Sequence, residues 1–276
     1  MKRIAVIGAG SWGTTLAQVL NDNGHKVALW VRNPEKANKI AHSRYNADYL
    51  PQLKLADAIE ISSDLTQAVS NAEILLLAVP SHGMADLCCQ LSKITDCTDK
   101  VSVSCTKGFE YHSGLRMSEI IKSYFPSATV AVLSGPNHAE EIAIRQPSAT
   151  VIACQNEDVA TELQNIFLND YFRPYLTDDV IGVEIAGSLK NVIALTSGIM
   201  FGLGFGDNSQ AALITRGLTE ITRLGLSLGA QQQTFSGLAG VGDLIATCTS
   251  KHSRNRRAGE ALAAGKTLEE ICAGTN

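Results

Sequence analysis

The sequence lacks the features of a disulfide-rich or metal-binding chain. Its seven cysteines are odd in number and form no CxxC pair, and its six histidines give neither an HExxH motif nor a cluster with cysteine. Disulfide frameworks use paired cysteines, and zinc sites use closely spaced cysteine or histidine ligands. We therefore expect a reduced, cytoplasmic protein that binds no metal.

Long apolar runs and an excess of positive charge are also missing. The uncharged stretch 192–205 has 14 residues, fewer than the roughly 18 that span a membrane. The apolar run within residues 1–7 is too short for a signal peptide. A net charge of −4 gives no general attraction to nucleic acid or anionic lipid. With 45% hydrophobic and 18% charged residues, the composition is that of a globular protein without membrane insertion.

The first part of the chain alternates short apolar runs with segments of helical pattern. The runs are not amphipathic, which is typical of parallel strands covered on both faces; they are residues 4–7, 27–30, 74–79, 101–103 and 130–133. From Asp178 onward the pattern is helical only. We predict a Rossmann-type doubly wound α/β domain over residues 1–180 and an all-α substrate and catalytic domain over residues 181–276.

Residues 8–13, GAGSWG, match the pattern GxGxxG between a predicted strand and a predicted helix. This is the order of a dinucleotide-binding βαβ unit, although a tight turn without a ligand is the alternative. Gly8 permits the sharp turn, Gly10 lets the backbone approach a pyrophosphate, and Gly13 lets the helix pack closely on the strand. The helix N-terminus then offers N–H groups to the phosphates.

The end of the second predicted strand indicates which cofactor is bound. An NAD-specific site usually carries Asp or Glu there, whereas this chain has Val31, Arg32 and Asn33. The Arg32 guanidinium suits a 2′-phosphate, so we expect NADPH to be preferred and NADH to be possible. An ordinary surface arginine is the alternative.

Polar loops follow three predicted strands, where ligands bind in open α/β sheets. They are residues 80–82, 106–108 and 134–137. Lys107 in the second loop would place an ammonium group near the reactive end of a bound nicotinamide. A solvated lysine is the alternative.

The helical part supplies a second group of polar residues. Lys190 lies in an otherwise apolar helix, where a lysine either extends to water or is desolvated. If it is desolvated, it can exchange a proton with a carbonyl oxygen. Asp243 ends a glycine-rich turn and could also be a helix N-cap. Ser253 and Asn255 lie among the basic residues of segment 251–257, where hydroxyl and amide donors suit one compact phosphate better than a nucleic acid.

Longer stretches resemble the bacterial NAD(P)-dependent glycerol-3-phosphate dehydrogenase family. They are GAGSWGTTLA from Gly8, YLP at Tyr49, AVPSH from Ala78, TKG at Thr106, SGP at Ser134, SLKN from Ser188, GDNSQAALITRGLTE from Gly206 and GLAGVGDLIATCTSKHSRNRR from Gly237. The last three lie outside the general nucleotide-binding pattern. The resemblance implies an oxidoreductase that interconverts sn-glycerol 3-phosphate and dihydroxyacetone phosphate and feeds glycerophospholipid synthesis.

The resemblance also implies the site residues. Lys190 would be the proton donor and acceptor, aided by Asp243. Besides the glycines, the cofactor contacts would be Ser11, Trp12, Arg32, Asn33, Tyr49, Lys107, Ala139 and Arg254. The substrate contacts would be Lys107, Gly135, Asn137, Lys190, Asp243, Ser253, Arg254 and Asn255.

Two departures and two alternatives accompany this interpretation. Asn137 and His138 stand where the family pattern has a small hydroxyl residue and Phe, and the chain stops at Asn276, so we expect a C-terminal domain that is truncated or incomplete. One alternative is another two-domain NADP-dependent reductase, of the hydroxyacid or ketopantoate type. The other is a sensor that binds NADPH without catalysis. A homodimer is possible.

Overall fold

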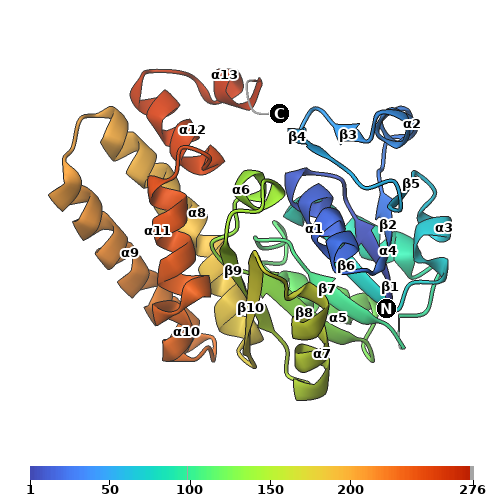
Figure 1. Cartoon of the computed structure of the whole chain (residues 1–276). Coiled ribbons are helices and arrows are strands. Elements are labelled where there is room, and N and C mark those ends of the chain that lie inside the picture. Colours follow the sequence, from blue (N-terminus) through green and yellow to red (C-terminus); the bar gives the residue numbers. More distant parts are fainter. Residues whose placement is uncertain (98, 274–276) are drawn as a thin grey trace. The chain divides into compact units, whose positions relative to one another are not determined.

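The computed structural model describes residues 1–97 and 99–273 and contains two compact units (Figure 1). The first unit is Met1–Val180, and the second begins at Ile181. Strands and helices alternate in the first unit, whereas the second contains helices only in its described part. The predicted fold class, a Rossmann-type sheet followed by an all-α part, is confirmed.

The first unit is built on a single large sheet. Its strand order in the described residues is β10-β9-β8-β7-β6-β1-β2-β5, with the bounds β1 (Arg3–Ile7), β2 (Lys26–Trp30), β5 (Glu60–Ser62), β6 (Ile74–Leu77), β7 (Val101–Ser104), β8 (Thr129–Ser134), β9 (Ser148–Ala153) and β10 (Phe172–Thr177). From β5 to β8 all neighbouring strands are parallel. The chain proceeds from β1 to β2 on one side and returns to β6 on the other. The strand order therefore reverses at β1, and α/β sheets bind ligands at the carboxyl ends of the strands at such a reversal.

Three strands of the sheet and a hairpin were not among the predicted strands. They are β5, β9, β10 and the hairpin of β3 (Tyr45–Asn46) with β4 (Leu50–Lys54). In addition, β9 is antiparallel to β8, in contrast to the predicted parallel sheet. The connection from β8 to β9 contains only the short helix α6 (Ala139–Ala143). At 1.5 Å per residue such a helix covers about 7.5 Å, too little to carry the chain back along a six-residue strand of about 20 Å.

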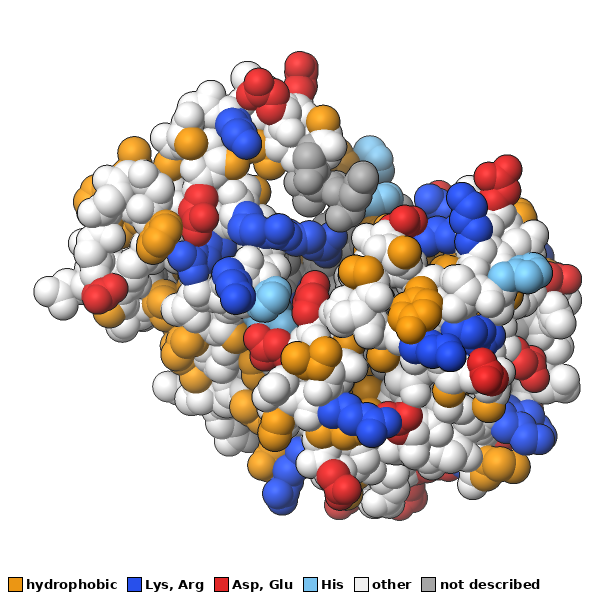
Figure 2. All heavy atoms as spheres, turned by 45° about the horizontal axis from the view of Figure 1, so that its top comes forward, with side chains coloured by type: hydrophobic (Ala, Val, Ile, Leu, Met, Phe, Trp, Pro, Cys, Tyr) orange, Lys and Arg blue, Asp and Glu red, His pale blue; other side chains and the backbone are white. Residues whose placement is uncertain are grey.

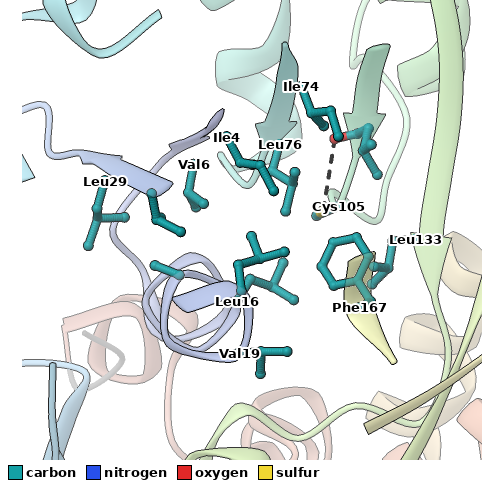
Figure 3. Packing of buried hydrophobic residues seen from close by; sticks show 14 of the residues in the cluster. Ile4, Val6, Leu16, Val19, Leu29, Ile74, Leu76, Cys105, Leu133 and Phe167 are labelled. Carbon is teal, nitrogen blue, oxygen red and sulfur yellow. Dashed lines mark hydrogen bonds between the residues drawn. The ribbon is translucent and has the colours of Figure 1, made fainter. Parts of the chain in front are cut away.

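Helices cover both faces of the sheet, because successive strand residues point to opposite sides. On one face Ile4 and Val6 of β1 pack with Leu16 of α1 and with Phe167 of α7, as Figure 3 shows. On the other face Ala5 and Ile7 are buried with residues of α3, α4 and α5. The bounds are α1 (Ser11–Asp22), α2 (Pro34–Ser43), α3 (Leu65–Ser70), the 3₁₀ turn η1 (Ser81–Gly83), α4 (Met84–Leu91), α5 (Met117–Tyr124) and α7 (Glu157–Phe167).

The second unit is organised around one long helix, α8 (Val180–Gly202). The other helices are α9 (Asp207–Ser227), α10 (Gln232–Ser236), the π-helical turn η2 (Leu238–Gly242), α11 (Asp243–Thr249), α12 (Arg254–Ala263) and α13 (Leu268–Ala273). Among the described residues, α8 has the length and apolar composition of a membrane span, but 56% of its apolar window is buried. Glu184 and Lys190 on this helix are buried too. We therefore describe α8 as the core helix of this unit.

Two glycines allow the backbones of α8 and α12 to touch. A Cβ atom on Gly198 would lie 2.0 Å from the carbonyl oxygen of Arg256, and one on Gly259 would lie 2.1 Å from that of Leu195. Both distances are far below van der Waals contact. The start of α12 is therefore held at a fixed place along α8.

All seven cysteines are free thiols. Five of them are buried: Cys88, Cys97, Cys105, Cys154 and Cys248. Cys272 on α13 is exposed. Figure 2 shows both acidic and basic side chains on the face that it draws.

Candidate functional site

The glycine-rich turn follows β1 and leads into α1. Gly8 has φ +116°, and a Cβ atom on it would lie 2.4 Å from the carbonyl oxygen of Ala78. A Cβ atom on Gly13 would lie 1.9 Å from the carbonyl oxygen of Gly8. At Gly10, by contrast, an added Cβ would meet no described atom within 4 Å. Gly8 and Gly13 thus hold the turn tightly on the sheet, while Gly10 faces open space that a phosphate can enter.

The N-terminus of α1 supplies donors at this open side. Gly10 is its N-cap residue, and the first bond within the helix runs from the Thr14 N–H to the Gly10 carbonyl oxygen at 3.0 Å. Backbone N–H groups ahead of Thr14 have no acceptor within the helix and can bind an anion. Ser11 begins the helix, and the half-buried Trp12 packs edge-on against Phe172 with ring centroids 6.4 Å apart.

Three of the predicted cofactor contacts, Arg32, Asn33 and Tyr49, lie after β2 and in the β3–β4 hairpin. Arg32 is exposed, and Asn33 caps α2 by accepting the Lys36 N–H at 2.9 Å. The Lys36 Nζ atom lies 4.1 Å from the centre of the Tyr49 ring and 2.8 Å from the Asp48 carboxylate. Lys36 therefore joins the hairpin to α2. Lys36 was not among the predicted site residues, although it lies only four residues after Arg32, on the helix that follows.

The loops after β7 and β8 are joined by the lysine that the sequence analysis selected. Lys107 Nζ donates to the Gly135 carbonyl oxygen at 3.0 Å. Gly135 has φ +152°, and a Cβ atom there would lie 3.2 Å from the Cα atom of Thr150. The positive φ, together with the close approach of β9, favours glycine at this position.

Asn137 and Ala139 lie in the connection from β8 to β9. The Asn137 amide donates to the Ala149 carbonyl oxygen at 2.9 Å and accepts the Thr150 hydroxyl at 2.8 Å. The side chain therefore braces the antiparallel strand pair, and its predicted contact with substrate stays a prediction. Ala139 is buried, and its carbonyl oxygen accepts the Thr15 hydroxyl of α1 at 3.2 Å.

A buried charged pair lies at the centre of the second unit. The Lys190 Nζ atom of α8 donates to the Asp243 carboxylate and, at 2.6 Å, to the Thr247 hydroxyl of α11. Lys190, Asp243 and Thr247 are 7%, 2% and 6% exposed. Buried charges are retained in proteins where they are paired and hydrogen-bonded, as here. The N-cap of α11 is Gly242, so Asp243 does not serve as the helix cap.

Thr247 belongs to this buried cluster but was not among the predicted site residues. Its hydroxyl donates to the Asp243 carbonyl oxygen at 2.6 Å, which turns its lone pairs toward Lys190. The spacing of four residues from Asp243 on one helix places both side chains on one face and was the available signal.

The predicted phosphate-binding segment begins α12. Ser253 is 3% exposed and caps this helix by accepting the Arg256 N–H at 3.2 Å. The Asn255 amide donates to Asn191 Oδ1 at 2.9 Å, next to Lys190 in the chain. Arg254 is exposed, whereas Arg256 packs over the Phe201 ring and pairs with Glu260. The structure thus brings Asn255 to α8 and leaves Arg254 accessible to a ligand.

Within residues 1–97 and 99–273, no group of three or more His, Cys, Asp or Glu side chains is arranged to hold a metal ion. Apart from the carboxylates of Asp48, Asp243 and Glu260, the polar groups described above are amines, guanidinium groups, amides, hydroxyls and backbone N–H groups. These donors suit phosphates and carbonyl oxygens.

Comparison with known proteins identifies the family. The model of the NAD-dependent glycerol-3-phosphate dehydrogenase N-terminus matches residues 3–160, and that of its C-terminus matches residues 179–276. The chain belongs to the NAD-dependent glycerol-3-phosphate dehydrogenase family. The resemblance seen in the sequence is confirmed, and the alternative reductase and sensor interpretations are not favoured.

Relatives in this family are similar over most of their length. A glycerol-3-phosphate dehydrogenase (NAD(P)+) of Thermoanaerobacter sp. (strain X514) is 50% identical over 268 residues, which are 97% of this chain and 80% of the relative. One of Corynebacterium jeikeium (strain K411) is 50% identical over 279 residues, 100% of this chain and 83% of the relative. The crystal structure of glycerol-3-phosphate dehydrogenase from Coxiella burnetii has a TM-score of 0.95 and 38% identity, covering 99% of this chain and 83% of that one.

Proposed function

We propose that the chain catalyses the reversible reduction of dihydroxyacetone phosphate to sn-glycerol 3-phosphate with NAD(P)H, and that it thereby feeds glycerophospholipid synthesis. The observation that carries this proposal is the buried Lys190–Asp243 pair, in a chain that belongs to the glycerol-3-phosphate dehydrogenase family. NADPH is the preferred cofactor and NADH a possible one.

The residues of the first unit fit a nicotinamide dinucleotide. Gly10 leaves room for the pyrophosphate and the start of α1 offers donors to it, while Gly8 and Gly13 allow the turn that brings these groups together. We propose further cofactor contacts by Ser11, Trp12, Arg32, Asn33, Tyr49, Lys107, Ala139 and, from the second unit, Arg254. When bound, the nicotinamide supplies or accepts the hydride at C2 of the substrate.

Lys190 moves the proton that must accompany the hydride. During reduction, we assign the Lys190 ammonium group to donate its proton to the C2 oxygen, and in the reverse direction the amine takes the proton back. Asp243 holds the ammonium form in a buried place by direct pairing, and Thr247 fixes the direction of Nζ. Lys190, Asp243 and Thr247 are already hydrogen-bonded to one another and buried from water. Little reorganisation is therefore needed when charge develops on the C2 oxygen of the substrate.

Polar groups in each unit are proposed to hold the substrate. Those of the first unit are Lys107, Gly135 and Asn137. Those of the second are Lys190, Asp243, Ser253, Arg254 and Asn255, of which the last three suit the phosphate because they combine a charge with hydroxyl and amide groups. A substrate held in this way has already lost translational and rotational freedom on binding, which lowers the entropic part of the activation barrier.

The function is tested by following the loss of NADPH absorbance when dihydroxyacetone phosphate is added, with NADH in a parallel assay. We expect oxidation with the phosphorylated ketone and very little with dihydroxyacetone. Equal turnover of both ketones would indicate a reductase of another substrate class. Binding of NADPH without oxidation would indicate a sensor.

Replacing Arg32 by alanine is expected to change the cofactor preference. The loss of one charge-assisted contact to a 2′-phosphate should raise the KM for NADPH about tenfold and leave that for NADH within about twofold. Steady-state kinetics with both cofactors measures this. The matched control is Arg173→Ala, which removes an exposed arginine on β10 and should change neither KM. An equal effect on both cofactors would contradict the assignment of Arg32.

The assembly and location belong to the same proposal. The protein binds a small-molecule substrate, and we propose a cytoplasmic homodimer without membrane insertion or nucleic-acid binding. Sedimentation measures the dimer, and fractionation of cells tests the location.

A further inference from the structure

Asn46 is a buried amide beside the glycine-rich turn. It lies on β3, is 0% exposed, and its Nδ2 atom is 2.8 Å from both the Ala9 carbonyl oxygen and the Thr14 hydroxyl oxygen. These bonds join the β3–β4 hairpin to the turn after β1 and to the first turns of α1. No part of the site assignment above includes Asn46.

The Asn46 amide is held in one orientation. A carbonyl oxygen can only accept, so the NH₂ group must face Ala9, since the amide oxygen would be repelled there. Among the described residues, Asn46 Oδ1 has no hydrogen-bond partner although it is buried. A buried acceptor without a partner is uncommon in proteins. The NH₂ group of Asn46 thus binds the oxygens of Ala9 and Thr14, while the Asn46 Oδ1 atom accepts no hydrogen bond from the described residues.

The position of the Ala9 oxygen decides where the next N–H points. The peptide bond between Ala9 and Gly10 is trans, and the oxygen and hydrogen of a trans peptide point in opposite directions. Asn46 holds the oxygen on its own side, so the Gly10 N–H points the other way. None of the hydrogen bonds found in residues 1–97 and 99–273 uses this N–H, and the space at Gly10 is open.

We propose that Asn46 is a positioning residue for the pyrophosphate of the cofactor, which rests on the proposed use of NAD(P)H. It fixes the Ala9–Gly10 peptide so that an N–H group faces the phosphates. Without the amide this peptide is free to rotate, and its carbonyl oxygen then faces the anion and repels it. Pre-organised donors bind more tightly because less freedom is lost on binding.

The test compares two ligands in Asn46→Ala and Asn46→Asp. NADPH contains a pyrophosphate, and adenosine 2′-phosphate does not. In Asn46→Ala the Kd for NADPH should rise about tenfold or more, whereas that for adenosine 2′-phosphate should change less than about twofold. In Asn46→Asp the NADPH affinity should fall further, because a carboxylate then faces the Ala9 oxygen. The kcat at saturating NADPH should stay within about twofold of the wild type.

The matched control is Asn23→Ala, at the opposite end of α1. Asn23 also donates its side-chain amide to a backbone carbonyl, that of Ile166, at 2.8 Å. This variant should lower thermal stability and leave both Kd values unchanged. Equal weakening of both ligands in Asn46→Ala, unchanged NADPH binding, or failure of both Asn46 variants to fold would overturn the role of Asn46. A wild-type protein that binds no NADPH would instead count against the proposed function.

Discussion

Lys190→Met is expected to lower kcat by about 10²- to 10⁴-fold, the contribution of a positioned proton donor. Methionine keeps a flexible apolar side chain of similar length in α8 but cannot donate a proton. The Kd for NADPH should stay within about twofold, because the glycine-rich turn and α1 belong to the first unit. Single-turnover NADPH oxidation measures the chemical step, and binding is measured separately by tryptophan fluorescence.

A double variant serves as the control that separates the catalytic effect of Lys190→Met from its effect on stability. The single variant leaves Asp243 buried without its cation, and breaking a buried pair in this way lowers the free energy of unfolding by about 3–5 kcal/mol. The double variant Lys190→Met/Asp243→Leu removes both charges and should regain much of this stability while remaining inactive. Activity in the double variant near that of the wild type would show that neither residue takes part in proton transfer.

Gly259→Ala is expected to displace α12 from α8. The three atoms nearest to the added Cβ all belong to the backbone, among them the Leu195 carbonyl oxygen at 2.1 Å and the Ile199 nitrogen at 2.7 Å. Backbone cannot move aside as a flexible side chain can. The free energy of unfolding should fall by about 3 kcal/mol, the upper part of the range for overpacking. Since Ser253 and Asn255 begin the same helix, the KM for dihydroxyacetone phosphate should rise about tenfold as the contacts loosen.

The control for this substitution is Gly83→Ala in the first unit. An added Cβ at Gly83 would meet no described atom within 4 Å, and its φ of −97° suits alanine. Stability and KM should therefore stay close to those of the wild type. Denaturant unfolding and steady-state kinetics of the two variants measure the difference. Equal behaviour of Gly259→Ala and Gly83→Ala would mean that α8 and α12 are not in close contact in solution.

The sequence predicted the elements whose patterns are local. Residues 4–7 and 27–30 are continuous apolar runs on either side of GxGxxG, and they form β1 and β2, which pair in parallel as in a βαβ unit. The strand β9 was not predicted, although residues 148–153 are largely apolar. It follows a short helix, α6, and runs antiparallel to β8, and no local pattern in the sequence indicates this reversal of direction. The strand β3 has only two residues and therefore shows no periodicity. For this reason no pattern in the sequence indicates a role for Asn46.

The candidate site was predictable by residue type more than by arrangement. Lys190 stood out as a charge in an apolar helix, and Asp243 as a carboxylate after a glycine-rich turn. Their pairing across 53 positions follows from the packing of α8 on α11, which no spacing in the sequence reveals. Asn137 was predicted as a substrate contact, but its side-chain amide is hydrogen-bonded to Ala149 and Thr150. Both residues lie on β9, a strand that was not predicted from the sequence.

The burial of the cysteines has a consequence for resistance to oxidation. Desolvation raises the pKa of Cys88 to about 12 and the pKa values of Cys97 and Cys248 to about 11. Peroxides and alkylating reagents attack the thiolate form, which these three side chains scarcely populate at neutral pH. An oxidant therefore meets the exposed Cys272 first, while Cys248, directly after Thr247 in the chain, is protected by both its surroundings and its protonation.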